Sequence, residues 1–248
     1  MVGPDWLEEV CYSCGELGHF ARDCWARPQY VWVEETPALH TSVTLPNWVP
    51  DSDTFMQELL AGHPKYWDKV VATDLHCRLG FVIAVDPKWE DWSDIEQLHL
   101  LLVARQGNIH SLRDLHGGHL PMLEFWQHHA NRIVFENFNL APSELQMFLH
   151  YPPSVPHLHI HICHRNGRDV RKPKVNILNN VINNICRDNH YYQKATLKFK
   201  VQEANRDGLY EAFVQAGIIK REPRKTYSRH SQCSESYLRD LIEYDIHE

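Results

Sequence analysis

Three histidines alternate with apolar residues in the run His-Leu-His-Ile-His-Ile-Cys, which occupies residues 157–163. Side chains of a β-strand point to opposite faces in turn, so the alternation predicts a strand with all three imidazoles on one face. Leu158, Ile160 and Ile162 then point the other way, into a core. Because a strand buries an apolar face only against further layers of structure, this run requires a sheet with a covering layer.

Three explanations fit the imidazoles of His157, His159 and His161: a metal site, a phosphate site with a nucleophilic histidine, or coincidence. Metal ligands usually converge from several elements, often with a carboxylate, and neither an H-x-x-E-H nor an H-E-x-x-H pattern is present. In phosphate chemistry, a neutral imidazole attacks phosphorus and forms a phosphoramidate, while neighbouring groups hold the non-bridging oxygens. The residues favour this second explanation and leave the other two open.

A second motif lies near the start of the chain, where three cysteines and one histidine have the spacing C-x2-C-x4-H-x4-C. The ligands of this array would be Cys11, Cys14, His19 and Cys24. Thiolate and imidazole form the tetrahedral shell that Zn²⁺ prefers, and Gly15 and Gly18 let so short a loop close around an ion. A module this small cannot bury a core, so bound zinc would supply its folding free energy. The array predicts a structural zinc site within residues 1–25.

The array resembles the zinc knuckle family, whose members bind single-stranded RNA or DNA. The resemblance implies that the rings of Tyr12 and Phe20 stack on unpaired bases, with single-stranded RNA as the partner. A zinc-stapled module that binds protein is the alternative.

Apolar patterns along the rest of the chain predict an α+β fold with an antiparallel sheet and helices packed on one side of it. The predicted strands cover residues 81–85, 98–104, 145–151, 157–163 and 196–201, and the predicted helices cover 118–131 and 174–187. Residues 26–67 contain several prolines and are predicted to be a linker or an irregular segment. A catalytic domain is expected over 68–217 and a charged tail over 218–248.

The composition fits a globular protein with a mildly acidic balance of 25 basic against 32 acidic residues, a formal net charge of −7. No apolar run approaches the roughly 18–20 residues needed to cross a bilayer, and residues 1–10 lack the basic and apolar regions of a secretory signal. We therefore expect a protein that acts in the cytoplasm or nucleus, without a membrane partner.

The flanks of the histidine strand make the phosphate explanation more specific. The stretch over 149–164 resembles the histidine triad (HIT) superfamily and, within it, the scavenger mRNA decapping enzymes. His150, Tyr151, Pro153 and Ser154 match the His-Tyr-x-Pro-Ser turn of that family. Further similarity lies in the Lys-Trp pair at 88–89, in Ser-Leu-Arg-Asp-Leu at 111–115, which opens a long helix in the family, and in residues 191–199. The resemblance covers about residues 68–217.

The resemblance implies a role for each matched residue. His159 would be the nucleophile that takes up the methylguanylate and loses it to water. His157 and His161 would flank the phosphates, with His161 also helping to orient or protonate the leaving nucleotide. The residues implied to contact the phosphate chain are Lys88, His150 and Ser154. The implied reaction hydrolyses cap dinucleotide or short capped RNA and releases 7-methylguanosine monophosphate, with no metal cofactor in catalysis. The family also implies a homodimer.

Upstream of Val70 the chain does not match the family's N-terminal domain, which grips the methylated base. Tryptophans beside acidic residues could grip the base instead, and the candidates are Trp48, Trp67, Trp89 and Trp92, with Asp51, Asp68, Glu90 or Asp91. Two other functions stay open: a HIT hydrolase of another dinucleoside polyphosphate, and a non-catalytic reader of RNA 5′ ends or caps on the same fold.

Overall fold

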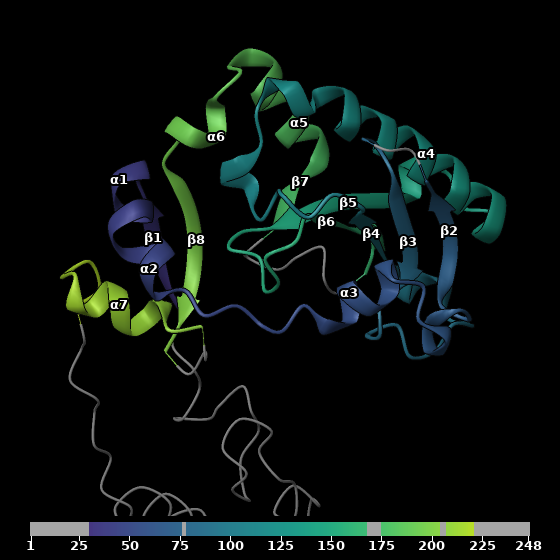
Figure 1. The fold of residues 1–248 in the computed structure, drawn as a ribbon, viewed down its shortest axis with the longest axis horizontal. Coiled ribbons are helices and arrows are strands. Elements are labelled where there is room, and N and C mark those ends of the chain that lie inside the picture. Colours follow the sequence, from purple (N-terminus) through teal and green to yellow (C-terminus); the bar gives the residue numbers. More distant parts are fainter. Residues whose placement is uncertain (1–29, 76–77, 168–174, 204–206, 221–248) are drawn as a thin grey trace, which may run out of the picture.

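The computed structural model describes residues 30–75, 78–167, 175–203 and 207–220 (Figure 1). Its centre is a six-stranded sheet in which every neighbouring pair is antiparallel. In spatial order the strands are β2 (Val70–Asp74), β3 (Phe81–Val85), β4 (His99–Ala104), β6 (His159–His164), β5 (Leu145–His150) and β7 (Val175–Ile177). The predicted α+β class with an antiparallel sheet is confirmed.

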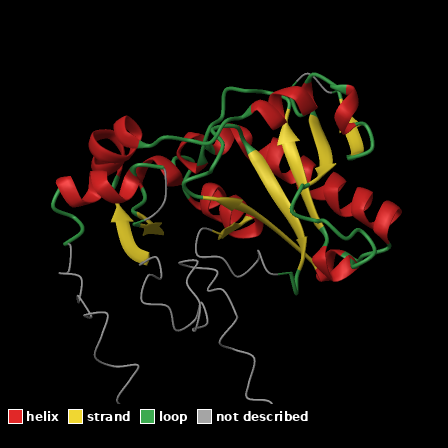
Figure 2. Ribbon diagram, turned by 90° about the horizontal axis from the view of Figure 1, so that it is seen from below, coloured by secondary structure: helices red, strands yellow, loops and turns green. Residues whose placement is uncertain are grey.

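Helices cover both faces of this sheet (Figure 2). On one face, α4 (Leu120–Phe138) and α5 (Leu178–Arg187) pack in the main core with alternate apolar residues of the strands. On the other face, Met56 and Leu59 of α3 (Thr54–Leu60) pack against β3 and β4. The expectation of helices on one side only is therefore wrong. The histidines of β6 lie on the same face as α3, because His159 and His161 pair in register with Val103 and Leu101, which contact that helix layer.

Residues 30–67 are ordered into short elements, so the prediction of an irregular segment over 26–67 is wrong for this part. They form β1 (Tyr30–Glu35), α1 (Pro37–Leu39), a π-helical turn (His40–Thr44), α2 (Leu45–Asn47), α3 and a 3-10 turn (Pro64–Tyr66). Pro37 and Pro64 stand in the first turn of a helix, where the missing N–H and fixed φ of proline favour a helix start. Prolines usually interrupt helices, which favoured an irregular segment, but Pro37 and Pro64 each begin a helical turn.

The strand expected over 196–201 forms as β8 (Leu197–Gln202). It lies outside the central sheet and pairs with β1 in a separate two-stranded sheet, with Val33 opposite Phe199. This small sheet lies at one end of the molecule, beside α7 (Leu209–Gln215), with α6 (Tyr191–Lys194) leading into it (Figure 1).

Two predicted helices differ at their ends. The first runs on to Phe138 because Ala130, Ile133 and Val134 continue its buried stripe, and Asn139 ends it in the left-handed region with φ 54°. The second begins at Leu178, since residues 175–177 are taken by β7, which pairs with β5. Ser-Leu-Arg-Asp-Leu at 111–115 forms a 3-10 turn rather than the opening of the long helix. The remaining 3-10 turns are Ile95–Gln97, Gly117–His119 and Pro142–Glu144.

A buried ion pair joins the small sheet to the 3-10 turn Leu112–Asp114, which lies between β4 and α4. The Arg113 guanidinium donates to a Glu35 carboxylate oxygen at 2.7 Å and to the carbonyl oxygens of Tyr192 and Ala195 at 2.9 and 2.7 Å. The Tyr151 hydroxyl also donates to Glu35. Burial raises the pKa of Glu35, but hydrogen bonds with His40, Tyr151 and Arg113 outweigh it and lower that pKa to about 2.

None of the helices in the described parts of the chain is long and apolar enough to cross a membrane.

Candidate active site

The triad histidines gather on the α3 face of the sheet, at the start of β6. His157, His159 and His161 are all buried, while Leu158, Ile160 and Ile162 lie in the main core behind them. The alternation in the sequence therefore separates the apolar and imidazole faces as expected. A small pocket opens here, lined in part by His150, His157 and His159.

His159 has a defined proton position. Its Nδ1 lies 2.7 Å from the carbonyl oxygen of His157, and a carbonyl only accepts, so Nδ1–H is the donor. A neutral imidazole has one N–H, which leaves the lone pair on Nε2. Burial lowers the pKa of His159 to about 4, so the ring is neutral at physiological pH. Nε2 of His159 is thus a nucleophile that needs no base to activate it.

His157 is held in the opposite orientation. Its Nε2–H donates to the carbonyl oxygen of Ala104 at 2.6 Å, which leaves the lone pair on Nδ1. The two rings are therefore oriented by main-chain carbonyl groups, one of His157 just before β6 and one of Ala104 at the end of β4.

His161 is packed between aromatic rings. It stacks on Phe148 with 5.1 Å between ring centroids and 11° between planes, and its centroid lies 4.3 Å from that of His150. Burial, together with the charges of His159, His150 and His99, lowers the pKa of His161 well below its usual range. Its Nε2 is buried and has no hydrogen-bond partner among the described residues.

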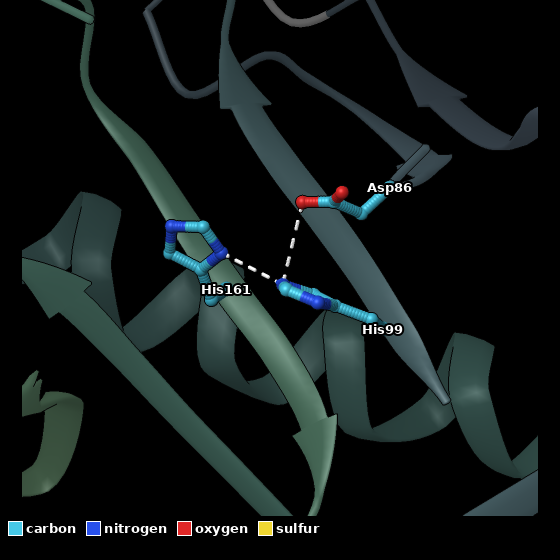
Figure 3. A group of neighbouring side chains, drawn as sticks. All are labelled: Asp86, His99 and His161. Carbon is cyan, nitrogen blue, oxygen red and sulfur yellow. Dashed lines mark hydrogen bonds and ion pairs between the residues drawn. The ribbon is translucent and has the colours of Figure 1, made fainter. Parts of the chain in front are cut away.

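Two residues that sequence reasoning missed lie directly beside His161 (Figure 3). His99, the first residue of β4, brings its Nε2 to 2.9 Å from His161 Nδ1 and to 3.4 Å from Oδ2 of Asp86, which follows β3. Ligand atoms of these three buried residues lie within 4.8 Å of one another, so they are also the group in the described chain that could hold a metal ion. No local pattern links positions 86, 99 and 161, because only strand pairing brings them together.

The residues predicted to contact phosphate lie around the histidines, on a loop, at a strand end and in a turn. Lys88 is exposed after β3, where its backbone N–H donates to Asp86 Oδ1 at 2.8 Å, and its charge contributes to lowering the pKa of both His159 and His161. His150 ends β5 beside His161. Ser154 is exposed in the turn before β6 and accepts a main-chain bond from Asp51 at 2.7 Å, but it does not line the small pocket.

His110 and Ser111 also line the pocket, and neither was among the predicted site residues. The Nδ1–H of His110 donates to the Pro156 carbonyl oxygen at 2.7 Å, which joins this loop to the turn before β6. Asp114 accepts the backbone N–H groups of both residues at 2.8 Å. Ser-x-x-Asp is a capping-box pattern, so the sequence contained a signal for the turn but none for its position beside the histidines.

The candidate tryptophans for base stacking differ in exposure. Trp89 is buried and donates from Nε1 to the Asp94 carbonyl oxygen at 3.1 Å, so it is a core residue. Trp67 and Trp92 are 68% and 47% exposed, and Trp48 packs partly against the main core. Exposure alone does not select one of them for a base.

The family model "Scavenger mRNA decapping enzyme C-term binding" matches residues 66–194. This is more than half of the chain, and the match contains the whole histidine face. The chain belongs to this family. Its central sheet with the triad on β6 is therefore the HIT-like domain of the scavenger decapping enzymes.

A zinc knuckle model matches residues 9–24, which confirms the motif and implies a structural zinc ion. Its predicted ligands Cys11, Cys14, His19 and Cys24, and the stacking candidates Tyr12 and Phe20, lie outside the described residues. The same holds for most of the predicted tail over 218–248.

Curated relatives carry the name m7GpppX diphosphatase. The relative from Ascaris suum is 28% identical over 83% of this chain and 67% of its own, and that from Caenorhabditis elegans is 30% identical over 74% of this chain and 59% of its own. The human relative is 31% identical over 54% of this chain and 40% of its own. The chain thus spans about two thirds or less of these relatives. Among solved structures, Hnt3 in complex with DNA and guanosine aligns over 77% of this chain and 98% of its own, with a TM-score of 0.38 and 14% identity.

Proposed function

We propose that this protein hydrolyses the 5′–5′ triphosphate of 7-methylguanosine cap dinucleotide or of short capped RNA, and releases 7-methylguanosine monophosphate. The observation that carries the proposal is His159, whose Nδ1–H is held by a main-chain carbonyl and whose Nε2 lone pair is available on a neutral ring. Membership in the decapping family and the names of the relatives support the choice of substrate.

The reaction has two steps. In the first, Nε2 of His159 attacks the phosphorus next to methylguanosine; the P–N bond forms and the bond to the bridging oxygen breaks, so a nucleoside diphosphate or diphosphate-ended RNA leaves. In the second, water attacks the same phosphorus, the P–N bond breaks and His159 is restored. His157 and His161 flank the phosphates, and Lys88, His150 and Ser154 stabilise the developing negative charge. No resident metal is needed for these steps.

The zinc knuckle extends this function toward RNA. We expect it to bind single-stranded RNA by stacking on Tyr12 and Phe20, with its zinc ion in a purely structural role. The homodimer and the cytoplasmic or nuclear location stay predictions.

The decisive experiment incubates the purified protein with labelled methylated cap dinucleotide, unmethylated cap dinucleotide, a dinucleoside polyphosphate and a capped decamer, and resolves the products. His159→Asn tests the nucleophile, and the same substitution at the exposed His128 on α4 is the matched control. We expect release of 7-methylguanosine monophosphate by the wild type and by His128→Asn, and none by His159→Asn.

Faster turnover of the dinucleoside polyphosphate than of either cap dinucleotide would show that this protein is a HIT hydrolase with a different substrate. A folded wild-type protein that binds capped RNA and turns over no substrate would identify the non-catalytic reader.

A further inference from the structure

Asp86, His99 and His161 form a continuous chain of polar contacts, which ends at the third triad histidine (Figure 3). Asp86, His99 and His161 are 4%, 5% and 3% exposed, so water does not compete for their bonds. The backbone holds the chain in place, because the Asp86 N–H donates to the His99 carbonyl oxygen at 3.0 Å. The other carboxylate oxygen of Asp86 accepts the Lys88 N–H at 2.8 Å, which leaves Oδ2 directed at His99.

Proton accounting along this chain gives one consistent arrangement. Nε2 of His99 lies within reach of Oδ2 of Asp86 and Nδ1 of His161. If Nε2 carried a lone pair, that lone pair would face a carboxylate oxygen in a buried site, where like partial charges are costly. If Nε2 carries the proton, both neighbours can accept from it. His161 Nδ1 is then an acceptor, and the single proton of this neutral ring lies on Nε2.

The proton on His161 Nε2 has no acceptor in the described protein. A buried donor without an acceptor is unfavourable, so a ligand that brings an acceptor oxygen is favoured here. The ring of His161 lies edge-on to that of His159, with 5.1 Å between their centroids, so such an oxygen would belong to a group that reacts at His159. The opposite tautomer would present a lone pair and repel the same oxygen.

We propose that Asp86 and His99 are positioning residues that fix His161 in the tautomer with its proton on Nε2, so that His161 donates a hydrogen bond to a phosphate oxygen of the substrate. The donation stabilises the charge that develops as the bond to the leaving nucleotide breaks, and no proton is transferred from His161. The role in turnover rests on the proposed function, whereas the tautomer does not.

The test compares His99→Gln, whose amide can still donate to His161 Nδ1, with His99→Met, which has similar volume and no donor. Nitrogen-15 spectra of histidine-labelled, zinc-loaded full-length protein report which ring nitrogen of His161 carries the proton. We expect Nε2–H in the wild type and in His99→Gln, and a mixture or Nδ1–H in His99→Met. In His99→Met the substrate would lose one hydrogen-bond donor, so we expect kcat to fall by about 10²-fold with a much smaller change in KM. His99→Gln should retain most of the wild-type kcat.

The proposal is overturned if wild-type His161 carries its proton on Nδ1, or if His99→Met changes neither the spectrum nor kcat. It is also overturned if the protein holds a second equivalent of zinc that survives Cys14→Ser and is lost in His99→Met, because the same three residues would then be metal ligands. A wild-type protein with the expected tautomer and no turnover would refute the proposed function and leave the positioning of His161 standing.

Discussion

His159 shows how a single residue acquires its chemistry from its surroundings. An exposed histidine has a pKa near 6.5 and is partly protonated in the cell. Burial on β6 lowers the pKa of His159 to about 4, and the carbonyl oxygen of His157 orients the ring. The fold thus sets both the protonation state of the ring and the direction of its Nε2 lone pair.

This environment predicts the pH dependence of turnover. In the proposed reaction only a neutral imidazole can attack phosphorus, and a folded-state pKa of about 4 keeps His159 neutral as the pH falls through 6 and 5. We expect the nucleophile's acid limb of kcat/KM to lie near pH 4, with a tenfold fall per unit below it. Stopped assays on cap dinucleotide between pH 3.5 and 8, with circular dichroism to establish that the protein stays folded, measure this limb. An acid limb near 6.5 that belongs to His159 would contradict the burial argument.

At the scale of elements, β1 pairs with β8 and is also joined to the 3-10 turn Leu112–Asp114 by a buried ion pair. Glu35 is fully buried and receives the Arg113 guanidinium at 2.7 Å, and both residues lie far apart in sequence. Breaking a buried pair from one side leaves an uncompensated charge, which is more harmful than removing both partners.

We therefore expect Arg113→Met to lower the free energy of unfolding by about 3–5 kcal/mol. The double variant Glu35→Leu with Arg113→Met should recover part of that loss, because it leaves no unpaired charge. Urea unfolding followed by tryptophan fluorescence measures both. The control Lys194→Met removes an exposed pair with Asp188 and should change stability little. If Arg113→Met and Lys194→Met lowered the free energy of unfolding by the same small amount, the Glu35–Arg113 ion pair would contribute little to stability.

Helix α3 makes a second prediction at this scale, since it is the layer that covers β3 and β4 beside the histidines. Leu59 is 3% exposed and packs on Val82, Ala84 and their neighbours. Leu59→Ala should cost about 2–4 kcal/mol of unfolding free energy. Leu45→Ala, at a residue 58% exposed, is the matched control and should cost far less. Equal costs in thermal or urea unfolding would mean that α3 does not seal this face.

The whole molecule combines a zinc module of the knuckle family with a HIT-like domain that has its own hydrophobic core. Because the described residues of this domain form an extensive buried core of their own, we expect folding of the domain not to depend on zinc. The two parts are then separable in function.

Cys14→Ser tests this separation. We expect it to lower the affinity for a single-stranded RNA oligomer by tenfold or more and to leave kcat/KM for cap dinucleotide and the melting temperature of the main transition unchanged. Fluorescence anisotropy and the product assay measure the two activities, and Cys186→Ser, at an exposed free thiol on α5, is the control. A parallel loss of dinucleotide hydrolysis in Cys14→Ser alone would show that the zinc module supports the catalytic domain directly.

Features that depend on local order could be predicted from the amino-acid sequence. Alternation along 157–163 placed the imidazoles on one face, continuous apolar runs placed β3 and β4, and the cysteine spacing identified the zinc motif. These are periodic or short-range patterns, which a chain displays before it folds.

Contacts that join distant segments could not be predicted in this way, because they form only when the strands assemble. Strand pairing brings His99 to His161 across 62 positions, and a buried cluster brings Glu35 to Arg113 across 78. Tertiary packing also determines that β8 lies outside the central sheet and that α3 lies on the histidine face. No neighbouring residue signals such contacts, because their stability comes from burial that exists only once several strands have assembled.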